Sequence, residues 1–221
     1  MIVKLTKELK DCKIGLLGFR QDILKPVLDE LNINYVSIDD MNTIDDTYDF
    51  VFMTGVYKLI PINILNAPTY GIFGFHETPL PEGRGHAPIN WTIENNRPNI
   101  TISLFKAGSG VDDGLIVYQH NVPIYRDDDR SILEFKRQYG VTECFRVFIF
   151  ELLEGVIILR EQSGLPSYSK KRKATNSELD VNKTLIELWD HLRLCHNDYY
   201  PAFFMLNENT KVILKYTIDR S

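Results

Sequence analysis

Short apolar runs and stretches of helical spacing alternate along the first half of this chain. An apolar run over 13–18 ends in glycine, and residues 23–31 then carry isoleucine, leucine and valine at the spacing of one buried helix face. The same patterns predict further strands at 35–38, 49–53, 70–75, 99–105 and 115–118, and helices at 61–65 and 87–96. Alternation of this kind is typical of an α/β fold, so we predict a Rossmann-like, doubly wound and mostly parallel sheet.

Helical patterns dominate after residue 125. Ser131 and Glu134 have the spacing of a capping box, which predicts that a helix starts there. The apolar run over 144–160 predicts a second helix that is fully packed, and residues 181–192 carry apolar positions along one face of a third. The side chains expected on the apolar face of the first of these helices are Ile132, Phe135 and Tyr139.

The C-terminal part of the chain differs in pattern from the rest. Residues 201–204 and 211–215 are apolar segments that predict a small β element. We therefore expect two units, a Rossmann-like domain over 1–163 and a helix-plus-β extension over 164–221.

The composition is that of an ordinary globular protein with an acidic balance. Of its 221 residues, 44% are hydrophobic and 25% are charged, and the formal net charge is −5. Domains that bind nucleic acid concentrate lysine and arginine, so we expect no nucleic-acid partner. The sequence shows neither a signal-peptide apolar region nor a membrane-spanning run, so we expect a cytoplasmic location and no membrane contact.

Cysteine, histidine and glycine spacings argue against several cofactors. Cys12, Cys144 and Cys195 fit neither a disulfide framework nor a zinc site. The histidines other than His76 show no metal-ligand spacing, so we predict no metal. Gly15 and Gly18 alone do not form a dinucleotide-binding fingerprint, which argues against a nicotinamide cofactor.

A histidine at the end of a strand and an acidic turn further along the chain suggest acid–base chemistry. His76 follows the apolar run over 70–75, and a loop stiffened by proline and glycine then carries Arg84 past it. Asp112 opens the acidic turn 111–114 at the end of another predicted strand. Ligands bind at the carboxyl ends of strands in open α/β sheets. His76 and Asp112 are therefore a candidate pair, with Asp113 the better candidate for a turn former.

The residues of this loop resemble the signature of the folate-dependent formyltransferases. The matching positions are His76, Leu80-Pro81, Arg84-Gly85 and Pro88. Residues 111–114 resemble the second catalytic loop of that family, and residues 57–61 resemble the segment that lines its pterin pocket. The tail positions Ser167-Tyr168, Lys171-Arg172 and 200–204 are similar to motifs of the short sugar N-formyltransferases.

The resemblance implies transfer of a formyl group from 10-formyl-tetrahydrofolate to the primary amine of a nucleotide-linked amino sugar, by a homodimer. His76, Asp112 and Asn90 are the expected catalytic residues. Folate contacts are expected from Tyr57, Lys58, Leu59, Ile60, Leu80, Pro81, Val111 and Asp112. Substrate contacts are expected from Glu77, Thr78, Arg84, Gly85, Lys171 and Arg172. Arg84 would bind either a substrate phosphate or a neighbouring carboxylate.

Other acceptors stay open, and one residue departs from the family pattern. Glycinamide ribonucleotide and methionyl-tRNA are alternative amines, and a non-catalytic folate- or nucleotide-sugar-binding protein is a third alternative. The family usually has an asparagine two residues before the histidine, where its amide holds the formyl oxygen, and this chain has Gly74. Asn90 or Glu77 could replace the amide, backbone donors alone could act, or catalysis could be lost.

Overall fold

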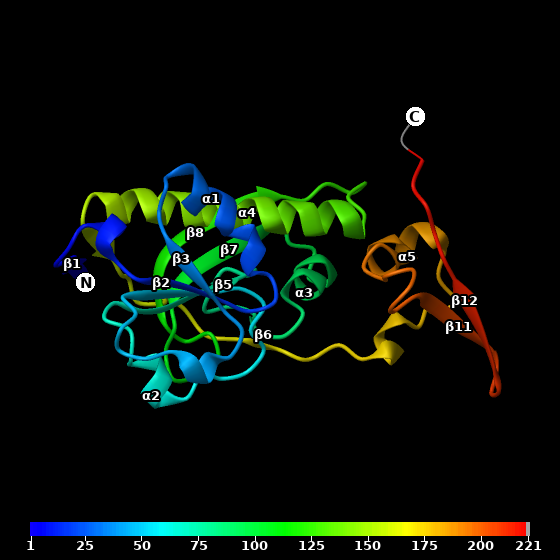
Figure 1. Ribbon diagram of the computed structural model, residues 1–221. Helices are drawn as coiled ribbons and strands as arrows, with labels where there is room; N and C mark the ends of the chain where they lie inside the picture. Colours follow the sequence, from blue (N-terminus) through cyan, green and yellow to red (C-terminus); the bar gives the residue numbers. More distant parts are fainter. Residues whose placement is uncertain (220–221) are drawn as a thin grey trace.

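A six-stranded sheet forms the centre of the computed structural model, which describes residues 1–219 (Figure 1). Its strands in spatial order are β3 (Tyr35–Ile38), β2 (Ile14–Leu17), β4 (Phe50–Met53), β5 (Gly71–His76), β7 (Asn99–Lys106) and β8 (Leu115–Pro123). The pairs from β3 to β5 are parallel, whereas β7 is antiparallel to both of its neighbours. The sequence prediction of an α/β fold with a mostly parallel sheet is confirmed.

Apolar side chains cover both faces of the sheet, as expected for parallel strands. On one face, Phe52 and Phe73 pack with the helices α1 (Lys25–Glu30), α3 (Pro88–Glu94) and α4 (Arg130–Leu153). On the other face, Val51 and Ile72 pack with α2 (Ile62–Leu65) and the 3₁₀ turn η3 (Met41–Thr43). Two further short turns, η1 (Leu9–Asp11) and η2 (Gln21–Ile23), lie before and after β2.

The long helix α4 corrects two sequence predictions. It runs without a break from Arg130 to Leu153, and Asp129 caps it by accepting a hydrogen bond from the Ile132 amide (3.0 Å), whereas Ser131 lies inside the helix. Gly155, at a φ of +75°, follows its end. Residues 156–158, which the apolar run placed in a helix, instead form β9 (Val156–Ile158), antiparallel to β1 (Ile2–Lys4).

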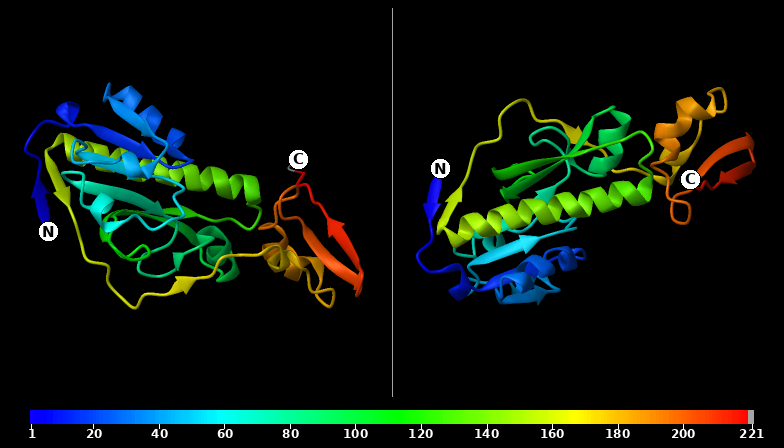
Figure 2. Two further views of the ribbon diagram at one scale, coloured as in Figure 1. Left: turned by 60° about the horizontal axis from the view of Figure 1, so that its bottom comes forward. Right: turned by 90° about the horizontal axis from the view of Figure 1, so that it is seen from above.

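The buried face of α4 also differs from the expected one. Leu133, Val141 and Cys144 face the sheet, but Phe135 is 68% exposed and Tyr139 is 48% exposed. Ile132 is half-buried. The helix lies across one face of the sheet along its whole length (Figure 2), so packing against β7 and β8, rather than the local apolar spacing, selects its inner face.

The C-terminal segment crosses the body and then forms a small unit beside it (Figure 1). Strand β10 (Tyr168–Ser169) pairs in parallel with β6 (Arg84–Gly85), and the turn η4 (Ala174–Ser177) follows. Helix α5 (Leu185–Leu192) begins after Val181, and β11 (Ala202–Asn207) pairs with β12 (Thr210–Leu214), which confirms the predicted β element. The boundary after residue 163 stays a prediction. No helix within residues 1–219 is long and apolar enough to cross a membrane.

Candidate active site

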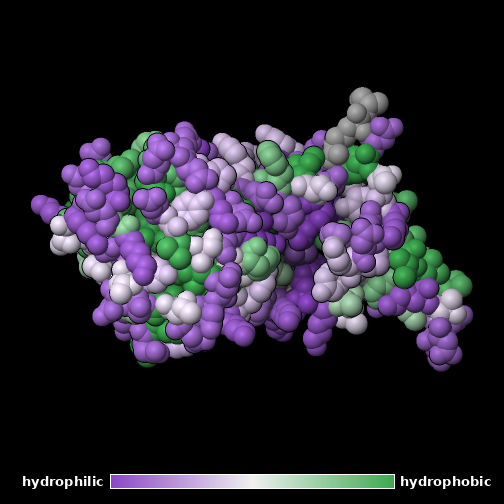
Figure 3. Space-filling model, viewed as in Figure 1, coloured by the Kyte–Doolittle hydropathy of each residue, from purple (hydrophilic) through white to green (hydrophobic). Residues whose placement is uncertain are grey.

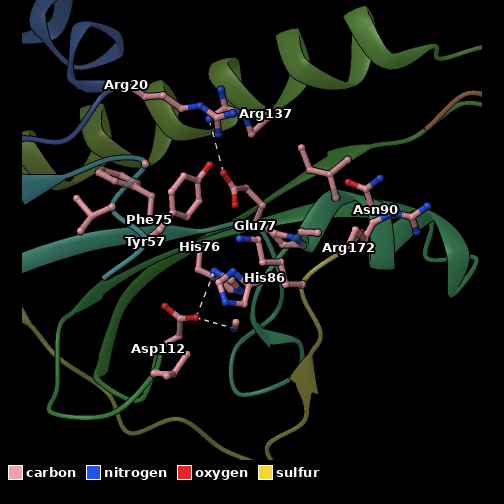
Figure 4. A pocket seen from close by; sticks show the side chains of 18 of the residues that line it. Arg20, Tyr57, Phe75, His76, Glu77, His86, Asn90, Asp112, Arg137 and Arg172 are labelled. Carbon is pink, nitrogen blue, oxygen red and sulfur yellow. Dashed lines mark hydrogen bonds and ion pairs between the residues drawn. The ribbon is translucent and has the colours of Figure 1, made fainter. Parts of the chain in front are cut away.

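A cavity of about 780 Å³ lies at the carboxyl ends of β4 and β5 (Figure 4). Met53 and His76, the last residues of these two strands, both line it. Its other walls come from loops 55–60 and 107–112, from residues 85–90, from the first half of α4 and from the C-terminal segment. The topology therefore places the candidate site at the sheet edge where open α/β sheets bind ligands.

His76 is buried, and its two ring nitrogens have different partners. Nε2 lies 2.9 Å from the carbonyl oxygen of Gly83. Because a carbonyl oxygen can only accept a hydrogen bond, Nε2 carries the hydrogen. Nδ1 lies 3.6 Å from Oδ2 of Asp112. Nδ1 is thus the ring atom that can gain or release a proton, and the Asp112 carboxylate would stabilise the charged ring.

The loop that carries Asp112 is held in a fixed shape. Asp112 has a left-handed backbone (φ 48°), and its Oδ2 accepts a hydrogen bond of 2.8 Å from the Gly85 amide. Asp113 accepts from the Gly110 amide (2.9 Å), as expected for a turn former. Gly114 has no room for a side chain, since a Cβ there would lie 1.7 Å from the Lys106 carbonyl oxygen. This geometry aims the Asp112 carboxylate at His76.

Arg84 braces this loop and does not face the cavity. Its Nη2 donates to Oε1 of Gln162 (2.7 Å), and its Nη1 donates to the Tyr168 hydroxyl (3.2 Å). Gln162 in turn donates to the carbonyl oxygens of Asp112 and Gly114, each at 2.8 Å. In this structure Arg84 contacts neutral groups and does not line the cavity, and its contact with a substrate phosphate or a carboxylate stays a prediction. No motif marks Gln162, so its role is not predictable from the sequence.

Three other predicted residues also lie away from the cavity. The Thr78 hydroxyl donates to the Glu82 carbonyl oxygen (2.7 Å), and Leu80 is buried against Phe105 and Ile116. Pro81 is buried as well. All three shape the loop behind His76 and do not line the cavity. The predicted positions that the structure does bring to the cavity are His76, Tyr57, Lys58, Leu59, Ile60, Val111, Asp112, Glu77, Gly85, Asn90, Lys171 and Arg172.

Neither side chain proposed to replace the family asparagine faces the His76–Asp112 pair. Oδ1 of Asn90 accepts a hydrogen bond from Arg130 (3.3 Å), and Figure 4 places Asn90 at the opposite end of the cavity from Asp112. The Glu77 carboxylate points toward Arg137 on α4, with its Oε1 at 3.6 Å from Nη1.

Three arginines and a glutamate form a basic cluster on the α4 side of the cavity. The Glu134 carboxylate oxygens lie 2.8 Å from Nη2 of Arg130, 2.9 Å from Nε of Arg137 and 3.9 Å from Nη2 of Arg20. Burial raises the pKa of the Glu134 carboxyl, but Arg137 and Arg130 more than offset this and hold it below its ordinary value. When Glu77 is counted as well, three arginines face two carboxylates, so the cluster keeps a formal net charge of +1. This cluster is not predictable from the sequence, because Arg20 and α4 are far apart in the chain.

The C-terminal segment brings further cations to the cavity and is tied to the body. Lys171 and Lys173 are exposed and line the cavity. Arg172 pairs with Glu94 of α3 and donates to the Asn176 carbonyl oxygen (2.9 Å), so its charge is already matched. The Trp91 indole donates to the Lys170 carbonyl oxygen (2.9 Å). Among residues 1–219, no group of three or more histidine, cysteine or acidic side chains is arranged to hold a metal ion.

Comparison with known proteins places this geometry in a family. The family model described as Formyl transferase matches residues 41–139, which include both His76 and Asp112. A methionyl-tRNA formyltransferase of Thermodesulfovibrio yellowstonii is 24% identical over 165 residues, which cover 75% of this chain and 54% of that protein. The chain spans about half the length of the curated relatives it matches.

Solved structures share the fold over nearly the whole chain. A 4-N formyltransferase from Francisella tularensis superposes with a TM-score of 0.79 at 19% identity, covering 95% of this chain and 99% of that one. The formyltransferase PseJ from Anoxybacillus kamchatkensis, in complex with UDP-4,6-dideoxy-4-formamido-L-AltNAc and tetrahydrofolate, gives a TM-score of 0.65 at 22% identity, covering 82% and 97%. Residues 41–139, which contain the signature loop and the second acidic loop, therefore match the formyl transferase family, and nearly the whole chain shares the fold of solved formyltransferases.

Proposed function

We propose that this protein transfers the formyl group of 10-formyl-tetrahydrofolate to the primary amine of a nucleotide-linked amino sugar. The observation that carries the proposal is the buried His76–Asp112 pair at the base of a cavity with two chemically distinct walls. One wall is mostly apolar and comes from loops 55–60 and 107–112, and the other is polar and basic. Two such walls suit two substrates that meet at the pair.

The apolar wall fits a folate. Tyr57 is exposed beside the cavity and its ring lies 5.6 Å from that of Phe19, so the pair offers a platform for a flat ring system. Leu59, Ile60 and Val111 supply aliphatic surface to the same cavity. When bound, 10-formyl-tetrahydrofolate would supply an activated formyl group, and these residues would hold it with the formyl carbon toward His76.

His76 and Asp112 provide the proton movement that amide formation requires. The acceptor nitrogen bonds to the formyl carbon, the bond from that carbon to folate N10 breaks, and the proton lost by the amine must reach N10. Nδ1 of His76 can take up and return that proton, directly or through water, while the Nε2 hydrogen bond to Gly83 fixes the ring. Asp112 at 3.6 Å stabilises the charged ring between these events.

The basic wall suits an acceptor that carries phosphate. Lys171 and Lys173 are exposed on the C-terminal segment, and the cluster of Arg20, Arg130 and Arg137 on the α4 side of the cavity retains one positive charge. Hydrophilic side chains also gather on the surface between the body and the C-terminal unit (Figure 3). This placement supports a diphosphate-linked substrate more than a neutral amine. The complex of PseJ with a UDP-linked sugar supports the same class.

A homodimer is part of this proposal. Exposed apolar side chains gather on the C-terminal unit, where Ile186 is 66% and Leu206 is 65% exposed, and Figure 3 shows this surface as hydrophobic. Contiguous apolar surface of this kind marks interaction sites. Light scattering after size-exclusion chromatography would show a mass twice that of the chain, and a strict monomer would contradict the proposal.

The first experiment is a formyl-transfer assay read by mass spectrometry. The protein is incubated with 10-formyl-tetrahydrofolate and a panel of thymidine- and uridine-diphosphate amino sugars. We expect one formyl group to be added to at least one of these sugars. Glycinamide ribonucleotide and methionyl-tRNA belong in the panel, because the curated relatives that match are methionyl-tRNA formyltransferases. Transfer to only one of these two compounds would identify it as the acceptor in place of the amino sugar. Folate binding without transfer to any amine would favour a binding protein.

A further inference from the structure

The space beside Gly74 is filled by two apolar side chains. A Cβ at residue 74 would lie 2.5 Å from Cε of Met53 and 3.2 Å from Cζ of Phe105, and both side chains line the cavity. Residues 74 and 76 are on the same face of β5, because side chains alternate along a strand. An amide donor on this face next to His76 is therefore absent, and apolar groups occupy its place.

The proposed reaction needs a hydrogen-bond donor in this region. Negative charge develops on the formyl oxygen as the amine attacks, and donors aimed at such an oxygen are a major source of rate enhancement in acyl transfer. Asn90 and Glu77 do not serve, because Arg130 holds Asn90 away from His76 and Glu77 faces Arg137. The donor must come from another group that lines the cavity.

His86 lies beside His76 in the cavity (Figure 4). The preceding residue, Gly85, donates its amide hydrogen to Asp112 (2.8 Å), and the amide of His86 donates to the Ser169 carbonyl oxygen (3.2 Å). The backbone of His86 is thus anchored next to the catalytic carboxylate. Its side chain is exposed and has no hydrogen-bond or ion-pair partner within residues 1–219. It is an unengaged polar side chain next to the candidate reaction centre.

We propose that His86 supplies the donor that the chain lacks at residue 74, a role that rests on the proposed formyl transfer. A ring N–H of His86 would donate a hydrogen bond to the formyl oxygen while negative charge develops there. His76 and Asp112 keep the proton transfer from the amine to folate N10, so His86 forms no covalent bond and undergoes no net change in protonation. The family amide and the His86 imidazole would then be alternative donors to one oxygen.

Substitution at residue 86 tests the role. We expect His86→Ala to lower kcat by about 10²–10³-fold, the usual effect of removing one such donor, with unchanged affinity for a stable folate analogue measured by fluorescence. His86→Gln keeps an N–H donor and should retain more turnover than the alanine variant. His120→Ala is the matched control, since this histidine lies on β8 outside the cavity. Turnover of His86→Ala within threefold of the wild type would overturn the proposal.

A rescue experiment separates a donor from a structural role. Met53→Ala makes room at residue 74, and Gly74→Asn then restores the family amide. Added to His86→Ala, this pair of substitutions should recover at least tenfold in kcat, which repair of a misfolded loop would not explain. Failure of both the rescue and the glutamine variant would overturn the proposal. A wild-type chain that formylates no amine would overturn both the proposed function and the role of His86. An active wild type with an equally active His86→Ala variant would overturn the role of His86 alone.

Discussion

At the scale of single residues, the site depends on how the two His76 nitrogens are used. The Gly83 carbonyl fixes Nε2 as a donor, which leaves Nδ1 beside Asp112. We expect His76→Asn and Asp112→Asn each to lower kcat by about 10²–10⁴-fold, the range for loss of general acid–base catalysis. Folate affinity should change little, because the wall formed by residues 57–60 is untouched. Steady-state kinetics with the best acceptor and a fluorescence titration measure the two effects.

Asp113→Asn is the matched control for Asp112. Its side chain accepts a hydrogen bond from Gly110 and does not line the cavity, and an asparagine oxygen can still accept that bond. Turnover should therefore stay near the wild-type value. If Asp112→Asn turned over as fast as Asp113→Asn, the carboxylate would have no part in the proton transfer.

The sequence predicts His76 and Asp112 because each belongs to a recognisable loop, but it cannot predict what surrounds them. Gln162 braces the Asp112 loop, yet it lies in a segment without any motif. Gly74 signals a missing amide, but only packing reveals that Met53 fills the space. Arg84 belongs to the signature loop, and its contact with Gln162 follows from the path of the C-terminal segment alongside that loop. Contacts between distant segments determine all three.

At the scale of elements, local sequence patterns predict most strands and helices but not the residues at which they begin and end. The apolar run over 144–160 is periodic enough to suggest one helix, although a glycine with positive φ ends α4 before β9. Likewise Ser131 and Glu134 match a capping box, but Asp129 holds the cap. Asp129 and Ser131 are both residue types that favour the N-cap position, and in the structure Asp129 caps the helix whereas Ser131 lies inside it.

The two candidate caps can be separated by mutation. Asp129→Ala should lower the free energy of unfolding by about 1 kcal/mol, the usual cost of losing an N-cap side chain. Ser131→Ala should change it by less than about 0.5 kcal/mol, because this residue lies on the exposed side of the helix. Urea denaturation followed by circular dichroism would measure both. Equal losses in the two variants, or a larger loss for Ser131→Ala, would contradict the assignment of Asp129 as the cap.

At the scale of the whole molecule, charge is distributed unevenly. The chain is acidic overall, with a net charge of −5, yet the cavity collects the arginine cluster on α4 together with Lys171 and Lys173. These cations come from separate segments of the sequence, and the lysines reach the cavity because residues 159–173 cross the body toward the C-terminal unit (Figure 1). Composition alone thus excludes a broadly basic surface but does not reveal a local one.

The exposed lysines at this cavity should set the affinity for a phosphate-bearing acceptor. Because neither lysine has an ion-pair partner among residues 1–219, Lys171→Gln with Lys173→Gln should raise the KM for a nucleotide-linked amino sugar about three- to tenfold and leave kcat and folate affinity nearly unchanged. Added salt should raise the wild-type KM as well, through screening of the same charges, and should affect the double variant less. Lys4→Gln, an exposed residue on β1 far from the cavity, should behave as the wild type. A KM that did not respond to the paired substitutions would place the acceptor's phosphates elsewhere, with the arginine cluster on α4 the next wall to test.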